Sequence, residues 1–425
     1  MLSVTSSLTL RRLAFALPAA FVSSGAVSAS PVSTREARMR RWQAALIGVV
    51  AFVALVQVTG AAALTLIPVK TEELRIPSAD PGITLYLRNK HLDIGDRFRG
   101  TVLFLHGGTY PGESFDVIFD GVDCPATKHS IKSFSFWDRL WKRQPGEDEP
   151  DYAGISWRSW LDYHAFSGFD VYFVDIRGYG RSTKPPEMDE PADKNPPVAR
   201  TDVALRDLAV AVDFILKRRN VQHLDLIGSA WGSALAASYA VQHPEHVNRL
   251  VFQSPIWLPD TPVIQVPWSL PAYRVVTREE ARQRWFDGVP EAKKADLIYC
   301  GWFDRWADRI WATDPEGGTH NPPIVRVPNG ALFDDQVYWS AGKALYNPAG
   351  IVAPVLLVRG EWDRVSTKHM TRNLFELLVN ARSKRRVVIP EATHMLMVEK
   401  NRLKLYGEVE RFLEERDVPA AVSGD

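Results

Sequence analysis

A short run in the middle of the chain predicts a tight turn between a buried strand and a helix. Residues 225–233 read Asp-Leu-Ile-Gly-Ser-Ala-Trp-Gly-Ser, so Gly228 and Gly232 stand two positions on either side of Ala230. Small residues at these places let a strained strand-to-helix turn pack closely, as in a nucleophile elbow. The central position of such a turn carries the nucleophile, and here it is alanine. The run therefore predicts a catalytic scaffold that lacks its reactive atom.

The two serines beside Ala230 do not restore this pattern. A nucleophile at Ser229 would have Ile227 and Trp231 at the positions that must be small. A nucleophile at Ser233 would have Trp231 and Leu235 there. Because large side chains prevent the close packing that the turn needs, Ala230 keeps the nucleophile position.

Strands alternate with amphipathic helices along most of the chain. Such alternation predicts an α/β fold with a mostly parallel sheet that is covered by helices on both faces. The expected strands are 72–77, 83–88, 101–105, 170–175, 223–227, 249–253, 353–358 and 385–389, and the first two form an antiparallel pair. The main expected helices are 157–166, 202–218, 367–379 and 399–415. Short segments rich in Trp and Pro interrupt this alternation between residues 257 and 348.

Five segments, taken in order, resemble those of the α/β-hydrolase superfamily. They are His106-Gly107-Gly108, residues 175–182, the elbow around Ala230, residues 360–363 and His394. The resemblance covers about residues 75–416 and is to members that carry a lid, such as serine esterases, proline-iminopeptidase-like enzymes, epoxide hydrolases and haloalkane dehalogenases. It implies an α/β-hydrolase fold with an eight-stranded, mostly parallel sheet and a helical lid insertion.

The resemblance also assigns roles to individual residues. It places the general base at His394 and the carboxylate that orients it at Asp363, with Glu361 as the rival for the second role. The backbone N–H groups of Gly108 and Trp231 would form the oxyanion hole. With serine at position 230, the implied reaction is hydrolysis of a carboxylic ester, lactone or amide. Epoxide and haloalkane chemistry is disfavoured, because those relatives use aspartate as the nucleophile.

Three explanations of Ala230 stay open. In the first explanation, the chain is a variant of a serine enzyme whose nucleophile was removed, and it traps uncleaved substrate. Alternatively, it is a natural non-catalytic protein that uses the pocket to bind a ligand. In the third explanation, His394 and Asp363 act as a base without covalent catalysis, for lyase or oxygenase chemistry. The first explanation accounts for the retention of the base, its carboxylate and the oxyanion donors.

Composition favours a small, apolar or aromatic ligand, and the chemistry that the resemblance implies makes it an ester-type substrate. The chain has 51 basic and 50 acidic residues, a balance that creates no field to attract nucleic acid. It has 14 tryptophans, several of them in the expected lid, which suggests a pocket with aromatic walls. The tryptophans chosen as pocket residues are Trp257, Trp268, Trp302 and Trp306. No ligand spacing predicts a metal site, and no glycine-rich loop predicts a nucleotide cofactor.

The N-terminal residues resemble a targeting region. Arginines precede an uncharged run from Trp42 to Val69, which is long enough to be a cleavable signal or a membrane anchor. We therefore expect an exported or membrane-anchored protein facing away from the cytoplasm, with an organellar location as the alternative. The expected domains are a targeting region (1–69), a core in two parts (70–256 and 349–416), a lid (257–348) and a flexible tail (417–425).

The chain contains two cysteines, Cys124 and Cys300. In an oxidising compartment they would be able to pair, joining the insertion after the first core strand to the lid. Two buried free thiols are the alternative, because sequence does not give the distance between them. The sequence gives no indication of the oligomeric state.

Overall fold

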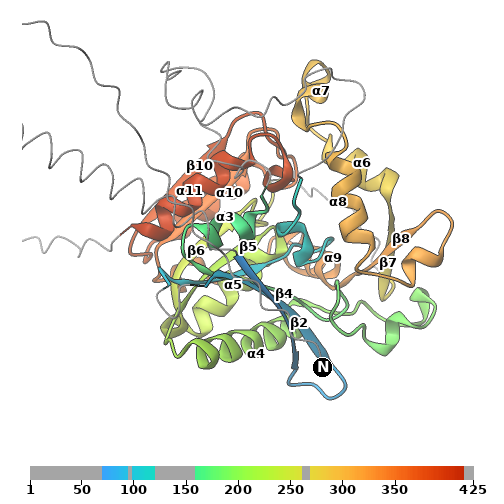
Figure 1. Cartoon of the computed structure of the whole chain (residues 1–425), viewed down its shortest axis with the longest axis horizontal. Coiled ribbons are helices and arrows are strands. Elements are labelled where there is room, and N and C mark those ends of the chain that lie inside the picture. Colours follow the sequence, from blue (N-terminus) through green and yellow to red (C-terminus); the bar gives the residue numbers. More distant parts are fainter. Residues whose placement is uncertain (1–68, 94–97, 120–157, 261–268, 416–425) are drawn as a thin grey trace, which may run out of the picture. The chain divides into compact units, whose positions relative to one another are not determined.

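The computed structural model describes residues 69–93, 98–119, 158–260 and 269–415 (Figure 1). All of them belong to one compact unit, Ile67–Asp425. Within these ranges no helix is long and apolar enough to cross a bilayer. The expected targeting region, apart from its last residue Val69, and the expected tail lie outside the described residues.

An eight-stranded sheet organises the core in the order β1-β2-β4-β3-β5-β6-β9-β10. Strand β2 is antiparallel to β1 and β4, and the remaining neighbours are parallel. The strands are β1 Val69–Pro77, β2 Thr84–Leu92, β3 Thr101–Leu105, β4 Asp170–Asp175, β5 Leu224–Ser229, β6 Val247–Gln253, β9 Val355–Gly360 and β10 Lys384–Ile389. Strands β3, β4 and β5 are buried along their whole length, as expected for parallel strands covered on both faces. The predicted α/β-hydrolase fold is confirmed.

Helices cover the sheet, and four of the five main ones pack in pairs. They are α3 Trp160–Phe166, α4 Thr201–Arg219, α5 Trp231–Gln242, α10 Lys368–Leu377 and α11 Arg402–Glu414. Helix α3 packs on α11, and α4 packs on α5. The Ser159 and Thr367 side chains accept hydrogen bonds from backbone N–H groups and so fix the beginnings of α3 and α10. Asn220, with φ 51°, ends α4 in a left-handed conformation.

The chain between β6 and β9 lies outside the large sheet, where the sequence predicted a helical lid. It contains β7 Tyr273–Thr277, α6 Arg278–Trp285, α7 Lys294–Leu297, α8 Trp302–Trp311, β8 Ile324–Pro328 and α9 Gly330–Asp334. Strands β7 and β8 pair antiparallel as a separate two-stranded sheet (Figure 1). This small sheet was not predicted, because its two strands are separated by about fifty residues and neither shows a clear period-two pattern.

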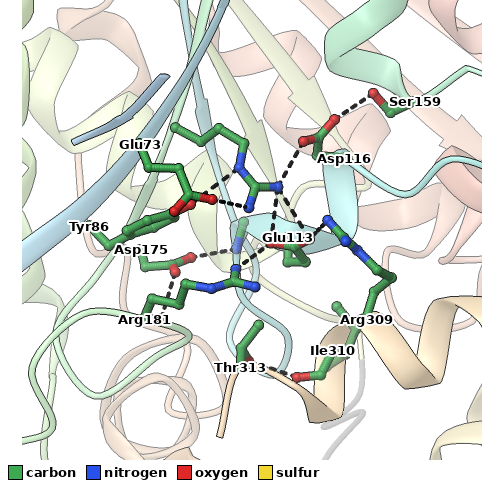
Figure 2. A network of polar contacts seen from close by, with 12 residues as sticks. Glu73, Tyr86, Glu113, Asp116, Ser159, Asp175, Arg181, Arg309, Ile310 and Thr313 are labelled. Atoms are coloured by element: carbon green, nitrogen blue, oxygen red, sulfur yellow. Dashed lines mark hydrogen bonds and ion pairs between the residues drawn. The ribbon is translucent and has the colours of Figure 1, made fainter. Parts of the chain in front are cut away.

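A buried ion cluster connects this segment to the core at η1, the short 3-10 helix Gly112–Phe115 (Figure 2). The Glu113 carboxylate is fully buried and contacts three guanidinium groups, those of Arg88, Arg181 and Arg309. Arg88 comes from β2, whereas Arg309 comes from α8. Because a buried carboxylate needs such partners, the cluster fixes η1 between the large sheet and α8.

Cys300 is disulfide-bonded in the structure. Cys124, the other cysteine in the sequence, lies outside the described residues. The pairing of Cys124 with Cys300 therefore stays a prediction.

Candidate active site

The turn between β5 and α5 has the backbone geometry of a strained elbow. Ala230 has φ 49° and ψ −114°, a conformation that costs a non-glycine residue about 1–3 kcal/mol. A Cβ atom at Gly228 would lie 2.3 Å from the carbonyl oxygen of Gly232. A Cβ atom at Gly232 would lie 2.2 Å from the carbonyl oxygen of Leu105 in β3. Both glycines are therefore required by close backbone approach, and the turn keeps its strain although position 230 carries only a methyl group.

His394 and Asp363 meet at the ends of neighbouring strands. Asp363 follows β9 and His394 follows β10, and the imidazole Nδ1 lies 3.0 Å from the nearer carboxylate oxygen. Burial favours the neutral acid, but the His394 contact and a backbone hydrogen bond from Ser366 hold the pKa of Asp363 below its ordinary value. The ionised carboxylate accepts a proton-bearing Nδ1, which leaves Nε2 as the basic nitrogen. The pair has the geometry of a general base and its orienting acid.

Glu361, the rival for the role of Asp363, points elsewhere. Its Oε2 accepts the backbone N–H of Glu391 at 3.0 Å, and its side chain is exposed. Asp363 is buried and also accepts the N–H groups of Val365 and Ser366, at 2.9 and 2.8 Å. The structure thus brings Asp363, and not Glu361, against His394.

One cavity of about 840 Å³ contains the nucleophile position and its expected partners. Its lining includes Ala230, Asp363 and His394, together with the two expected oxyanion donors, Gly108 and Trp231. Trp231 is the first residue of α5, so its N–H has no carbonyl partner within the helix. The five residues come from four separate parts of the chain, and the strand order brings them together.

His106 positions the loop that carries Gly108. Its Nδ1 donates to the carbonyl of Gly107 at 2.8 Å, and its Nε2 accepts the N–H of Ile176 at 3.1 Å. Burial lowers the pKa of His106 to about 4, so the ring is neutral and is not a competing base. Because the peptide is trans, the Gly108 N–H points opposite to the Gly107 carbonyl and hence away from His106.

The expected tryptophan wall of the pocket is not what the structure contains. Trp257 is buried and donates to Asn373, while Trp302 stacks on Phe119. Trp306 is fully buried and packs edge-on against Tyr110. None of these three lines the cavity, whose tryptophans are Trp231 and Trp339, and Trp268 lies outside the described residues. The assignment of Trp257, Trp302 and Trp306 to the pocket is wrong. A tryptophan can fill either the protein core or a pocket wall, and its place in the sequence does not distinguish the two.

Glu399 was not singled out by the sequence, although it supports the loop that carries His394. Its buried carboxylate accepts the backbone N–H of Thr393 at 2.9 Å and contacts the Thr393 hydroxyl. Burial raises the pKa of Glu399 to about 8. A glutamate between a loop and a helix has no pattern that distinguishes it from a solvated residue, so only the structure identifies it.

We expect Glu399→Gln to flatten the pH dependence of stability. The folded protein holds the Glu399 proton up to about pH 8, whereas the unfolded chain loses it near pH 4.5. Stability from this group is therefore complete below pH 4.5 and is lost as the pH rises toward 8. Urea unfolding should show that the free energy of unfolding of the unmodified chain falls by at least about 1 kcal/mol from pH 5 to pH 8. The variant should not show this fall. Glu291→Gln, at a side chain that is 86% exposed, is the control and should keep the fall.

One group of possible metal ligands occurs among the described residues. The Glu245 carboxylate lies 3.7 Å from His243 and 3.9 Å from His246, just beyond the end of α5. The elbow is at the other end of this helix of 12 residues, about 18 Å away. The group therefore belongs to a different part of the surface, and none of its members lines the cavity.

Fold and site together define a hydrolase scaffold, and comparison with known proteins agrees. Residues 149–401 match the family described as the alpha/beta hydrolase fold. Because this match covers more than half of the chain, the protein belongs to the α/β-hydrolase family.

Individual relatives are distant. Over 108 residues the chain is 29% identical to bifunctional epoxide hydrolase 2 of Sus scrofa, a match that covers 25% of this chain and 17% of that protein. Over 259 residues it is 26% identical to protein ABHD8 of Homo sapiens, covering 57% of this chain and 48% of that protein. The chain thus spans less than half the length of these relatives.

Similarity to solved structures extends over most of the chain. The 2-hydroxy-6-oxo-6-phenylhexa-2,4-dienoate hydrolase of Rhodococcus sp. strain RHA1 superposes with a TM-score of 0.50 at 14% identity. The superposition covers 81% of this chain and 99% of that one. At this identity the likeness concerns the fold alone.

Proposed function

We propose that the scaffold is that of a carboxylic ester hydrolase, with ester, lactone and amide bonds as the substrate class. The chain with Ala230 binds substrate and scarcely turns it over. The observation that carries this proposal is the hydrogen-bonded His394 and Asp363 beside a strained elbow in one cavity. A base held by a buried carboxylate is what a hydroxyl nucleophile requires.

In the Ala230→Ser form, the reaction follows from the positions of these groups. The Nε2 atom of His394 takes the hydroxyl proton while the serine oxygen attacks the carbonyl carbon. The N–H groups of Gly108 and Trp231 stabilise the oxyanion, and His394 then protonates the leaving group. Water, activated by the same imidazole, releases the acyl group and restores the serine. With alanine the first bond cannot form, but the donors that bind the carbonyl belong to the backbone and are unchanged.

A natural ligand-binding protein is the second candidate. It is favoured by Ala230 itself, because a binding protein needs the cavity and the oxyanion donors but no nucleophile. A dyad of His394 and Asp363 acting as a base for lyase or oxygenase chemistry would likewise need no hydroxyl.

Fluorophosphonate labelling separates these candidates. A hydrolase scaffold should react with the probe in the Ala230→Ser form and not in the unmodified chain, since only an activated serine forms the phosphonyl bond. Adding His394→Gln to the serine form should abolish the labelling. Turnover by the unmodified chain that is lost with His394→Gln would instead support the dyad. No labelling of the serine form, combined with ligand binding by the unmodified chain, would support the binding protein.

We also propose that the protein is exported or held at a membrane by its N-terminal segment. The support is the arginines that precede the uncharged run from Trp42 to Val69. Expression of the whole chain followed by fractionation should recover it in the membrane or exported fraction. Recovery in a salt-washed cytosolic fraction would contradict this proposal.

A further inference from the structure

Arg274 places a charge beside the oxyanion loop and makes no ion pair with a carboxylate of the described residues. Its Nη1 donates to the Pro328 carbonyl at 3.0 Å and the Asn329 side chain at 3.1 Å. Its Nη2 donates to the Gly108 carbonyl and the Thr109 hydroxyl, both at 3.0 Å. All four acceptors are neutral, and the buried Nε has no hydrogen-bond partner among the described residues. Since a guanidinium held among neutral groups keeps its charge, this position attracts an anion.

A second cation and a free hydroxyl accompany Arg274. Within the part of the chain that the structure describes, Arg284 from α6 makes no ion pair and the buried hydroxyl of Tyr110 has no hydrogen-bond partner. All three side chains line the cavity that contains Ala230 and His394. Burial raises the pKa of Tyr110 to about 12, although the charges of Arg284 and Arg274 act in the opposite direction. The phenol is therefore a hydrogen-bond donor within the field of both guanidinium groups.

The acidic residues of the cavity do not neutralise this pair. Each of the three lining carboxylates has a partner of its own: Asp363 with His394, Asp287 with Arg364 at 3.8 Å, and Asp335 with the Ser340 hydroxyl at 3.0 Å. Burial raises the pKa of Asp335, so that group carries less negative charge than an exposed aspartate. Arg274, Arg284 and Lys368 are then the lining cations without an ion pair to a described residue. Arg274 and Arg284 both act on Tyr110, and the nearby Glu280 of α6 acts on Arg284 without forming an ion pair with it.

The arginines also lie where two cavities meet. A second cavity, of about 930 Å³, shares Arg274, Arg284, Asp287 and Arg364 with the catalytic one. Its own lining includes exposed charged side chains of α6, so it is the more polar of the two. A substrate group that reaches from the elbow toward this second cavity passes the two guanidinium groups.

We infer that the catalytic cavity selects an ester that carries a carboxylate, held by Arg274, Arg284 and the Tyr110 hydroxyl, while the ester carbonyl lies at the elbow. The identity of the cleaved bond rests on the proposed function, whereas the binding of the carboxylate does not. The inference modifies the expectation of a purely apolar substrate, since much of the lining is hydrophobic but Arg274 and Arg284 lie together where the second cavity joins it.

The first test compares two esters in the Ala230→Ser form. They are p-nitrophenyl hexanoate and mono-p-nitrophenyl adipate, which have six-carbon acyl chains and differ by one terminal carboxylate. Charge-assisted hydrogen bonds predict a kcat/KM that is about tenfold or more higher for the adipate ester. Arg284→Gln should lower this preference about tenfold. Arg282→Gln is the matched control, because Arg282 lies on the same helix, packs over Phe286 and Phe303 and does not line the catalytic cavity. It should keep the preference.

The second test measures binding to the unmodified chain by calorimetry, so it does not depend on turnover. Monomethyl adipate should bind about tenfold or more tightly than dimethyl adipate, and Arg284→Gln should remove the difference. If this result is obtained while the serine form hydrolyses no ester, the proposed function fails and the carboxylate site stands. Equal binding of the two adipates, or an equal effect of Arg284→Gln and Arg282→Gln, would overturn the inference.

Discussion

Ala230→Ser is expected to raise the turnover of a chromogenic ester by at least about 10³-fold over the unmodified chain, the order of magnitude that a nucleophile contributes in triad enzymes. The backbone of position 230 already has φ 49°, and a Cβ atom is already present there. Serine therefore adds one hydroxyl group to a turn that is otherwise formed. The base, its carboxylate and the oxyanion donors need no further change.

The control for this experiment adds the same hydroxyl elsewhere in the cavity. Ala331 lines the same cavity and is 7% exposed, as Ala230 is, but it lies at the start of α9 and not at the elbow. Ala331→Ser should not gain activity. Steady-state kinetics with a panel of p-nitrophenyl esters would measure both variants. Equal rates for the two serine variants and the unmodified chain would show that the elbow is not used for acyl transfer.

The sequence predicted those parts of the site that depend on short-range geometry. The spacing of Gly228, Ala230 and Gly232 identifies the elbow because backbone contacts at 2.2 to 2.3 Å tolerate only hydrogen at both outer positions. Asp363 follows the buried strand β9 and His394 follows the edge strand β10, so the strand order places them together once the sheet is assumed. These features follow from local steric rules and from one topological rule, that the carboxyl ends of parallel strands meet at one edge.

The sequence did not predict the parts of the site that depend on packing between distant segments. Arg274 reaches Gly108 from β7, and no local sequence pattern predicted the pairing of β7 with β8. Trp302 and Trp306 have the helical spacing that would suit a pocket wall, yet they are buried between α8 and the core, against Phe119 and Tyr110. Both cases have the same physical cause. The burial of a side chain depends on which distant segment packs against it, and the local sequence pattern does not show which segment that is.

Gly232→Ala is expected to destabilise the fold by at least about 3 kcal/mol, although alanine favours a helix by about 1 kcal/mol over glycine. The new methyl group would lie 2.2 Å from the carbonyl oxygen of Leu105 and 2.6 Å from that of His106. Both are backbone atoms of β3 and of the oxyanion loop, so neither can rotate away. Helix α5 must instead move from the sheet, which breaks the packing of the elbow.

Urea unfolding of Gly232→Ala and Gly318→Ala would separate this clash from a general effect of replacing glycine. Gly318 has no neighbouring atom within 4 Å of an added Cβ, and its φ is not in the left-handed range, so its variant should be nearly as stable as the unmodified chain. Equal midpoints for the two variants would mean that β3 and α5 can separate at little cost. In that case the fold would tolerate a looser elbow, and the retention of glycine at 232 would need a reason other than close packing. A large difference would show that the tight turn is imposed by the sheet itself, whatever residue stands at position 230.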